Sequence, residues 1–137
     1  EALKIALRDN IMDVIATDHA PHGEEEKAKS MSKAPFGIVG LETAFSLTMT
    51  ELVTTGYLTP MQMVEKMSLN PAKILGIDKG SLAVGNMADL VIANPKQQYQ
   101  IDVNEFASKG KNTPFHGKDV VGRIKTTIVA GEIVYQD

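Results

Sequence analysis

The chain has 137 residues, the size of one ordinary domain and too few for a closed (β/α)8 barrel, which needs roughly 250 residues. Its 43% hydrophobic and 23% charged residues are typical of a folded protein and argue against disorder. A net charge of -3 without a basic stripe argues against a nucleic acid partner, and no apolar run is long enough to predict a membrane span. The absence of cysteine excludes disulfides and thiolate metal sites and is consistent with the cytoplasm.

The first part of the chain alternates helical and strand-like patterns. Residues 1–7 have a helical composition, and the short apolar run at 14–16 predicts a strand that is buried on both faces. That strand ends at a polar cluster, which runs from Thr17 to His22. The charged segment 23–33 predicts a solvated loop or a short helix.

Helices dominate the next segment. One helical face is indicated by the spacing of Leu41, Phe45, Met49 and Leu52. A second helix, from Thr59 to about Leu69, begins with a capping threonine, a proline at the first helical position and Gln62 three residues after the cap.

A third helix is predicted after Asn70 and Pro71, which repeat the cap-and-proline pattern, and it should end at Gly76. Three methionines in this region are interpreted as core residues: Met61, Met63 and Met67.

The pattern changes to β structure after Gly76. Gly80 and Gly85 flank a turn, residues 89–93 predict a strand that Pro95 follows, and residues 120–129 and 132–135 predict two more strands joined at Ala130 and Gly131. The sequence therefore predicts two parts, 1–76 and 77–137, with a boundary between Gly76 and Gly80.

A candidate site lies in the polar cluster, where Asp18, His19 and His22 fall within five residues at the end of the predicted strand. In α/β proteins the carboxyl ends of buried parallel strands are where chemistry is placed. A carboxylate there can bind a metal and move a proton, and an imidazole can bind a metal or an anion. The spacing alone equally allows a capping aspartate and two surface histidines.

The run TDHAPH from Thr17 to His22 closely resembles the last barrel strand of dihydroorotases, which are members of the amidohydrolase superfamily. Later motifs are similar in sequence and order: PFGIVGLETA at 35–44, SLNPA at 68–72, GSL at 80–82 and GNMADLV at 85–91. The segment SKGKNTPF at 108–115 resembles a dihydroorotase signature more than its counterpart in dihydropyrimidinases or allantoinases.

The resemblance implies an α/β fold: 1–76 would be the C-terminal part of a metal-dependent (β/α)8 TIM barrel, and 77–137 would be strands of a small composite β-sandwich domain. It implies zinc-dependent interconversion of N-carbamoyl-L-aspartate and L-dihydroorotate, a step of pyrimidine (UMP) synthesis. By match to the motif, Asp18 would bind zinc and transfer the proton, and His22 with the backbone of Phe36 and Gly37 would bind the free carboxylate of the substrate.

Most of the family's zinc ligands have no counterpart here, since the only histidines are His19, His22 and His116 and no His-x-His pair occurs. We therefore expect the remaining Zn²⁺ ligands from a missing N-terminal part of the same protein, and we expect the 137 residues alone to be inactive. A homodimer or a complex with aspartate transcarbamoylase also stays open as a partner.

Two alternatives have different functions: a dihydropyrimidinase-like or allantoinase-like cyclic amidohydrolase, and a noncatalytic dihydroorotase-like assembly partner. His19 is given no site role beyond orienting Asp18 or the loop, and His116 is interpreted as a turn or packing residue. Asn112 and Thr113 belong to the signature but have no assigned chemical task.

Overall fold

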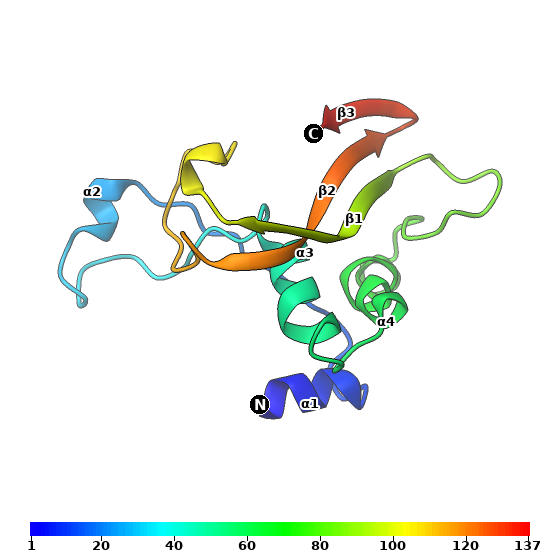
Figure 1. Ribbon diagram of the computed structural model, residues 1–137, viewed down its shortest axis with the longest axis horizontal. Helices are drawn as coiled ribbons and strands as arrows, with labels where there is room; N and C mark the ends of the chain where they lie inside the picture. The colour runs from blue at the N-terminus through cyan, green and yellow to red at the C-terminus, as the bar shows by residue number, and fades with distance from the viewer.

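The computed structural model describes residues 1–137 and contains helices and one small sheet (Figure 1). The helical elements are α1 (Ala2–Arg8), α2 (Glu24–Lys27), α3 (Ala44–Thr48), η1 (Met49–Val53), α4 (Pro60–Val64), η2 (Glu65–Leu69), α5 (Asn70–Leu75) and η3 (Val103–Glu105). The strands are β1 (Leu90–Gln100), β2 (Asp119–Val129) and β3 (Glu132–Gln136). The helix at 1–7, the short helix in the charged loop and the β-rich C-terminal part are thereby confirmed.

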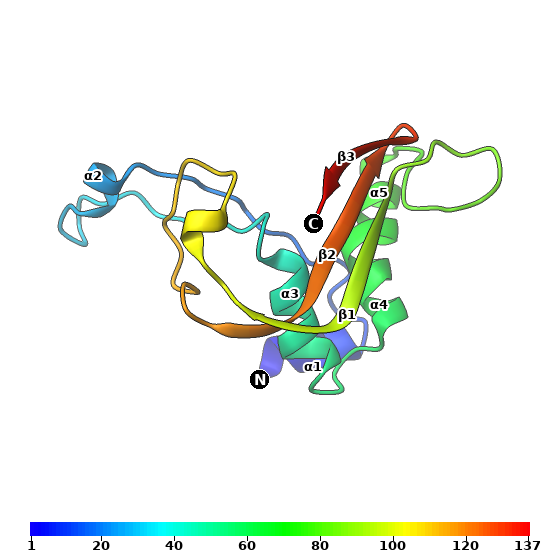
Figure 2. The same cartoon turned by 45° about the horizontal axis from the view of Figure 1, so that its top comes forward.

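The three strands form an antiparallel sheet in the order β1-β2-β3, and the strands lie in front of the helices in Figure 2. The strand predicted at 89–93 is longer than expected, because β1 continues through Pro95 to Gln100. A shift in register between Asn94 and Gln98 takes the proline out of the hydrogen-bonded ladder, so its missing N–H costs no bond.

The turn predicted between β2 and β3 is confirmed. Ala130 has a φ of 51° and Gly131 a φ of 85°, so both central residues are left-handed, as the tightest antiparallel hairpins require.

The strand predicted at 14–16 is wrong for this chain, because these residues have no regular secondary structure. A strand needs a neighbour that completes its backbone hydrogen bonds, and all three strands of the chain lie in the antiparallel sheet. The Ile15 N–H donates instead to the carbonyl of Lys66 on η2, at 3.0 Å.

The helix start at Thr59 is confirmed. The Thr59 hydroxyl accepts from the Gln62 N–H at 3.2 Å, and the Gln62 side chain accepts from the Thr59 N–H at 2.8 Å. The separate helix predicted at Asn70 is wrong, because α4, η2 and α5 form one continuous helix. The wider π turn of η2 precedes Pro71, which has no N–H for a regular turn, and the helix ends at Gly76 with a φ of 65°.

The helix of α3 and η1 packs against β2. A Cβ atom on Gly122 of β2 would lie 2.8 Å from the Cγ atom of Met49, so only glycine allows this close approach. Met49 and Leu52 are buried as predicted, whereas Leu41 precedes the helix and is 64% exposed.

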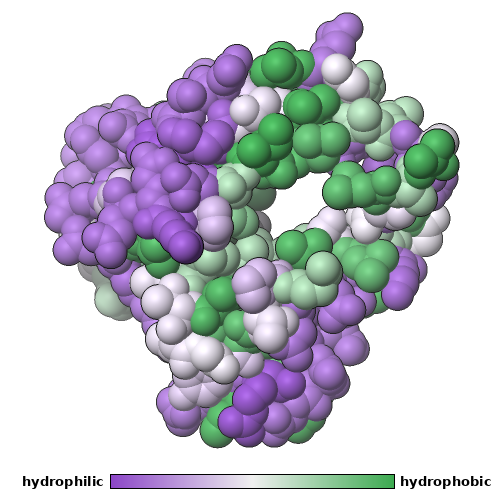
Figure 3. Space-filling view, turned by 45° about the vertical axis from the view of Figure 1, so that its right-hand side comes forward, coloured by the Kyte–Doolittle hydropathy of each residue, from purple (hydrophilic) through white to green (hydrophobic).

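Only 15 of 137 residues are buried, so the core is small. Met63 is buried as expected, but Met61 is 70% exposed, which makes the core interpretation wrong for Met61. Figure 3 shows apolar side chains gathered around an opening on one face of the molecule, so much apolar surface has no cover within this chain. No helix has both the length and the apolar character needed to cross a membrane.

Candidate functional site

The long helix of α4, η2 and α5 holds the segment that leads to the polar cluster. The Lys66 ammonium, buried in the structure, donates to the Met12 carbonyl at 2.7 Å, and the Asn70 side chain donates to the Asp13 carbonyl at 3.0 Å. With the Ile15–Lys66 bond, these contacts fix the backbone just before Asp18 although no strand forms there.

Asp18 itself is exposed and has a φ of 46°. Left-handed backbone is rare outside glycine but is tolerated by aspartate. Its carboxylate takes part in no hydrogen bond and no ion pair of the chain. A carboxylate so placed is free to bind a cation or to accept a proton.

His19 holds two parts of the site together. Its Nδ1 accepts from the N–H of Gly40 at 3.1 Å and from the N–H of Leu41 at 3.3 Å. An Nδ1 that accepts carries no proton, so the neutral ring has its proton on Nε2. The structure thus gives His19 the role of orienting the loop, one of the two roles considered from the sequence.

The structure brings three of the predicted site residues together. The Nε2 atom of His22 lies 2.9 Å from the carbonyl oxygen of Phe36, next to Gly37. A carbonyl oxygen can only accept a hydrogen bond, so the Nε2 atom of His22 donates. The other ring nitrogen, Nδ1, lies 3.8 Å from a carboxylate oxygen of Glu26. The Nδ1 atom can donate to an anion only when it carries a proton, and the Nε2–H can do so only by leaving the Phe36 carbonyl.

The backbone at Phe36 and Gly37 presents N–H groups that donate to no other atom of the chain. Gly37 has a φ of 104°, and a Cβ atom there would lie only 2.5 Å from the Cβ of Ala20. This position requires glycine for both reasons. Two unpaired backbone donors beside an imidazole can bind a carboxylate.

Lys27 of α2 makes contacts that the sequence did not predict. Its ammonium donates to the carbonyls of Pro35 at 2.9 Å and Gly37 at 3.1 Å. The charged segment is therefore not only solvated, since one of its residues closes the loop that carries Phe36. A lysine amid other charged residues gives no local signal for such a contact.

The tail residues of the signature lie near this loop or form local turns. The segment around residues 110–112 runs beside the 20–22 and 36–39 segments (Figures 1 and 2). Thr113 accepts from the Phe115 N–H at 3.3 Å, and His116 accepts from the Val103 N–H at 3.3 Å. His116 is thus a turn residue, as expected.

No group of three or more His, Asp or Glu side chains in the chain could hold a metal ion. Asp18 is the one free carboxylate of the cluster, while His19 and His22 each use a ring nitrogen on the backbone. The residues of this chain alone do not fit a complete zinc site.

A cavity of about 480 Å³ lies elsewhere, between the start of the α3 segment, the sheet and η3. Arg123 in its lining is already paired with Asp137 at 3.0 Å and stacks on the Tyr99 ring at 4.9 Å. None of the predicted site residues lines it, so this cavity is not the candidate site.

Comparison with known proteins identifies relatives over the whole chain. A family model described as the amidohydrolase family matches residues 1–134. A dihydroorotase of Clostridium acetobutylicum is 48% identical over 137 residues, and one of Pelotomaculum thermopropionicum is 54% identical over 136 residues. These matches cover 100% and 99% of this chain and 32% of each relative, so the chain spans about a third of their length.

Solved structures of cyclic amide hydrolases have the same arrangement of elements. An L-hydantoinase (dihydropyrimidinase) from Arthrobacter aurescens superposes with a TM-score of 0.92 at 36% identity, and a dihydropyrimidinase from Brevibacillus agri with 0.92 at 28% identity. Each match covers 98% of this chain and 31% of the solved chain.

Proposed function

The chain belongs to the amidohydrolase family, and from this premise we propose that it is the C-terminal part of a dihydroorotase. The observation that carries the proposal is the 48–54% identity, over essentially the whole chain, to relatives named dihydroorotase. The complete protein would interconvert N-carbamoyl-L-aspartate and L-dihydroorotate in pyrimidine synthesis, in the cytoplasm.

The two parts of the chain have separate places in this proposal. Residues 1–76 supply the last barrel segment and its helices, and 77–137 supply strands of a small β domain. The helical part ends at the left-handed cap of Gly76, and every strand follows it, which supports this division. The missing N-terminal part of the protein would cover the exposed apolar surface.

In the hydrolytic direction, Asp18 takes a proton from the attacking water, and the water oxygen bonds to the carbonyl carbon of the ring amide. The ring C–N bond then breaks, and Asp18 passes the proton to the leaving nitrogen. An exposed carboxylate with no partner in the chain supports this role. Asp18 would also be the single zinc ligand that this chain contributes, and the other ligands would come from outside it.

His22 and the backbone of Phe36 and Gly37 bind the free carboxylate of the substrate. Their proximity and the two unpaired N–H groups support this assignment. A carboxylate that accepts from two backbone donors and from the His22 ring is anchored in the site, which contributes to substrate binding.

A second candidate is a cyclic amidohydrolase that acts on hydantoin or dihydropyrimidine rings, with the L-hydantoinase at 36% identity as its support. The test is to purify the complete gene product that contains this chain and to assay it with L-dihydroorotate, dihydrouracil and hydantoin. We expect turnover of L-dihydroorotate only, and none by the 137 residues alone. Preference for an uncharged ring contradicts the proposal, because the carboxylate site would then have no ligand.

A further inference from the structure

Asn112 joins two segments of the candidate site that lie far from it in the sequence. Its Oδ1 accepts from the His22 N–H at 3.0 Å. Its Nδ2 donates to the carbonyls of Ala20 at 2.9 Å and Gly37 at 3.2 Å. Its own carbonyl accepts from the Val39 N–H at 3.0 Å. One half-buried side chain thereby connects the 20–22 loop with the 37–39 loop.

The chemistry of the partners determines the orientation of the Asn112 amide. A backbone N–H can only donate and a carbonyl can only accept, so Oδ1 must face His22 and Nδ2 must face Ala20 and Gly37. Both hydrogens of Nδ2 are used. An aspartate has no hydrogen for the two carbonyls, so asparagine is the residue that this set of partners requires.

Two glycines let these segments approach closely enough for the contacts. A Cβ atom on Gly110 would lie 2.7 Å from the Cβ of Pro21, and one on Gly37 would lie 2.5 Å from the Cβ of Ala20. The tail segment is therefore in van der Waals contact with the loop between Ala20 and His22, and Asn112 holds it there.

We propose that Asn112 is a positioning residue of the substrate site, which sets the distance and orientation between His22 and the Phe36–Gly37 backbone. This inference rests on the proposed function in one respect: His22 and the N–H groups of Phe36 and Gly37 must contact the substrate carboxylate. Asn112 itself touches neither substrate nor Asp18. Its role is to make the C-terminal segment part of the binding site.

The position of Asn112 predicts a specific kinetic effect. Its bonds reach the groups that bind the carboxylate and not Asp18, so their loss weakens substrate binding in the ground state and the transition state alike. We expect Asn112→Ala to raise KM about tenfold, equivalent to about 1.4 kcal/mol, and to leave kcat within about threefold of the parent.

The experiment uses the complete gene product with L-dihydroorotate, and Asn104→Ala is the matched control. The Asn104 side chain is exposed and donates only to Asp102, two residues away. We expect this control to leave KM and kcat unchanged. An unchanged KM in folded Asn112→Ala overturns the proposal, and so does an equal rise of KM in both variants. If the alanine variant does not fold, Asn112→Ser, which is neutral and too short to reach both carbonyls, is measured against the same expectation.

Amide hydrogen exchange tests the same bonds without catalysis. We expect the His22 amide to exchange at least about tenfold faster in Asn112→Ala, whereas the Met63 amide in the long helix exchanges at the parent rate. An unchanged rate at His22 overturns the anchoring role. If the parent does not turn over L-dihydroorotate, the proposed function fails while the exchange experiment still decides on the anchoring. If the parent is active and neither KM nor exchange changes, only the role of Asn112 fails.

Discussion

At the scale of single residues, the polar cluster divides its tasks according to what each side chain binds. His19 accepts from the backbone at Gly40 and Leu41, and His22 donates to the Phe36 carbonyl. Both imidazoles thus shape the loop. The Asp18 carboxylate has no partner in the chain, which leaves it available for chemistry.

This division predicts that Asp18→Asn abolishes turnover without affecting the fold. The amide can neither accept nor return a proton, so we expect kcat of the complete protein to fall by about 10²–10⁴-fold. In the metal-free protein the midpoint of urea unfolding should stay the same, because the carboxylate makes no bond within the chain. The control is Asp13→Asn, also exposed and five residues earlier, which should keep full activity. Activity of Asp18→Asn within tenfold of the parent would contradict the role.

The sequence could single out Asp18, His22, Phe36 and Gly37 as candidate site residues because they lie in short motifs. It could not assign a task to Asn112, since the partners of its side chain are 75–92 residues away along the chain. Contacts of that range depend on how distant segments meet. A local pattern carries no information about them.

At the scale of elements, the features predicted correctly are those that depend on neighbours in sequence. The cap formed by Thr59 and Gln62 and the turn at Ala130 and Gly131 are set by residues within three positions of one another. The strand at 14–16 and the helix break at Asn70 were predicted wrongly. A strand requires a partner strand, and a proline inside a helix can be accommodated by a π turn.

The helix cap provides a test at this scale. Thr59→Ala removes the oxygen that accepts from the Gln62 N–H, and we expect it to lower the free energy of unfolding by about 1 kcal/mol. The control Thr55→Ala removes a hydroxyl that only bonds back to the Glu51 carbonyl, so its effect should stay within about 0.5 kcal/mol. Urea unfolding of both variants measures the two changes in the free energy of unfolding. Equal effects would show that the cap does not stabilise this helix.

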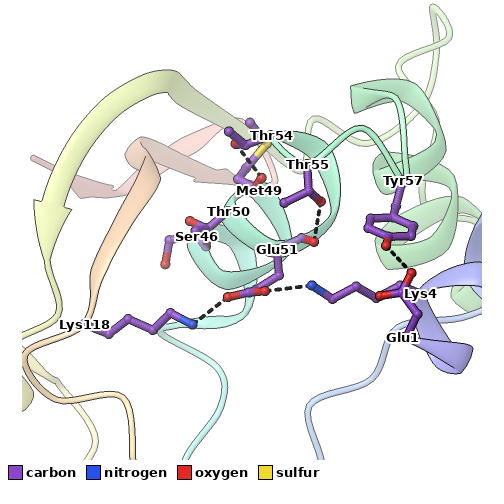
Figure 4. Close-up of polar contacts among 10 residues, drawn as sticks. All are labelled: Glu1, Lys4, Ser46, Met49, Thr50, Glu51, Thr54, Thr55, Tyr57 and Lys118. Carbon is purple, nitrogen blue, oxygen red and sulfur yellow. Dashed lines mark hydrogen bonds and ion pairs between the residues drawn. The ribbon is translucent and has the colours of Figure 1, made fainter.

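At the scale of the whole molecule, few side chains are buried, and polar contacts join elements that share little apolar core. Figure 4 shows one group of these contacts, with Glu51 of η1 between two lysines. The Glu51 carboxylate accepts from Lys118, which precedes β2, at 2.6 Å and from Lys4 of α1 at 2.8 Å. One side chain thus connects the first helix, the central helix and the sheet.

These contacts make the stability of the protein depend on pH through the ionisation of Glu51. The hydrogen bonds from Lys118 and Lys4 lower the pKa of Glu51 from 4.5 to about 2. A carboxyl group with a lowered pKa stabilises the fold at pH values above its pKa in the unfolded chain. This contribution is lost as the pH falls from about 4.5 to about 2. Because the groups are partly exposed, we expect the total to be about 1 kcal/mol at neutral pH.

Glu51→Gln should therefore be less stable than the parent at neutral pH, and the difference in the free energy of unfolding should shrink between pH 4.5 and 2. Urea unfolding at a series of pH values measures this difference. The control is Glu65→Gln, an exposed glutamate of the neighbouring helix that forms no ion pair, and its difference from the parent should stay near zero throughout. A difference for Glu51→Gln that does not change between pH 4.5 and 2 would mean that the charge of Glu51 does not stabilise the fold.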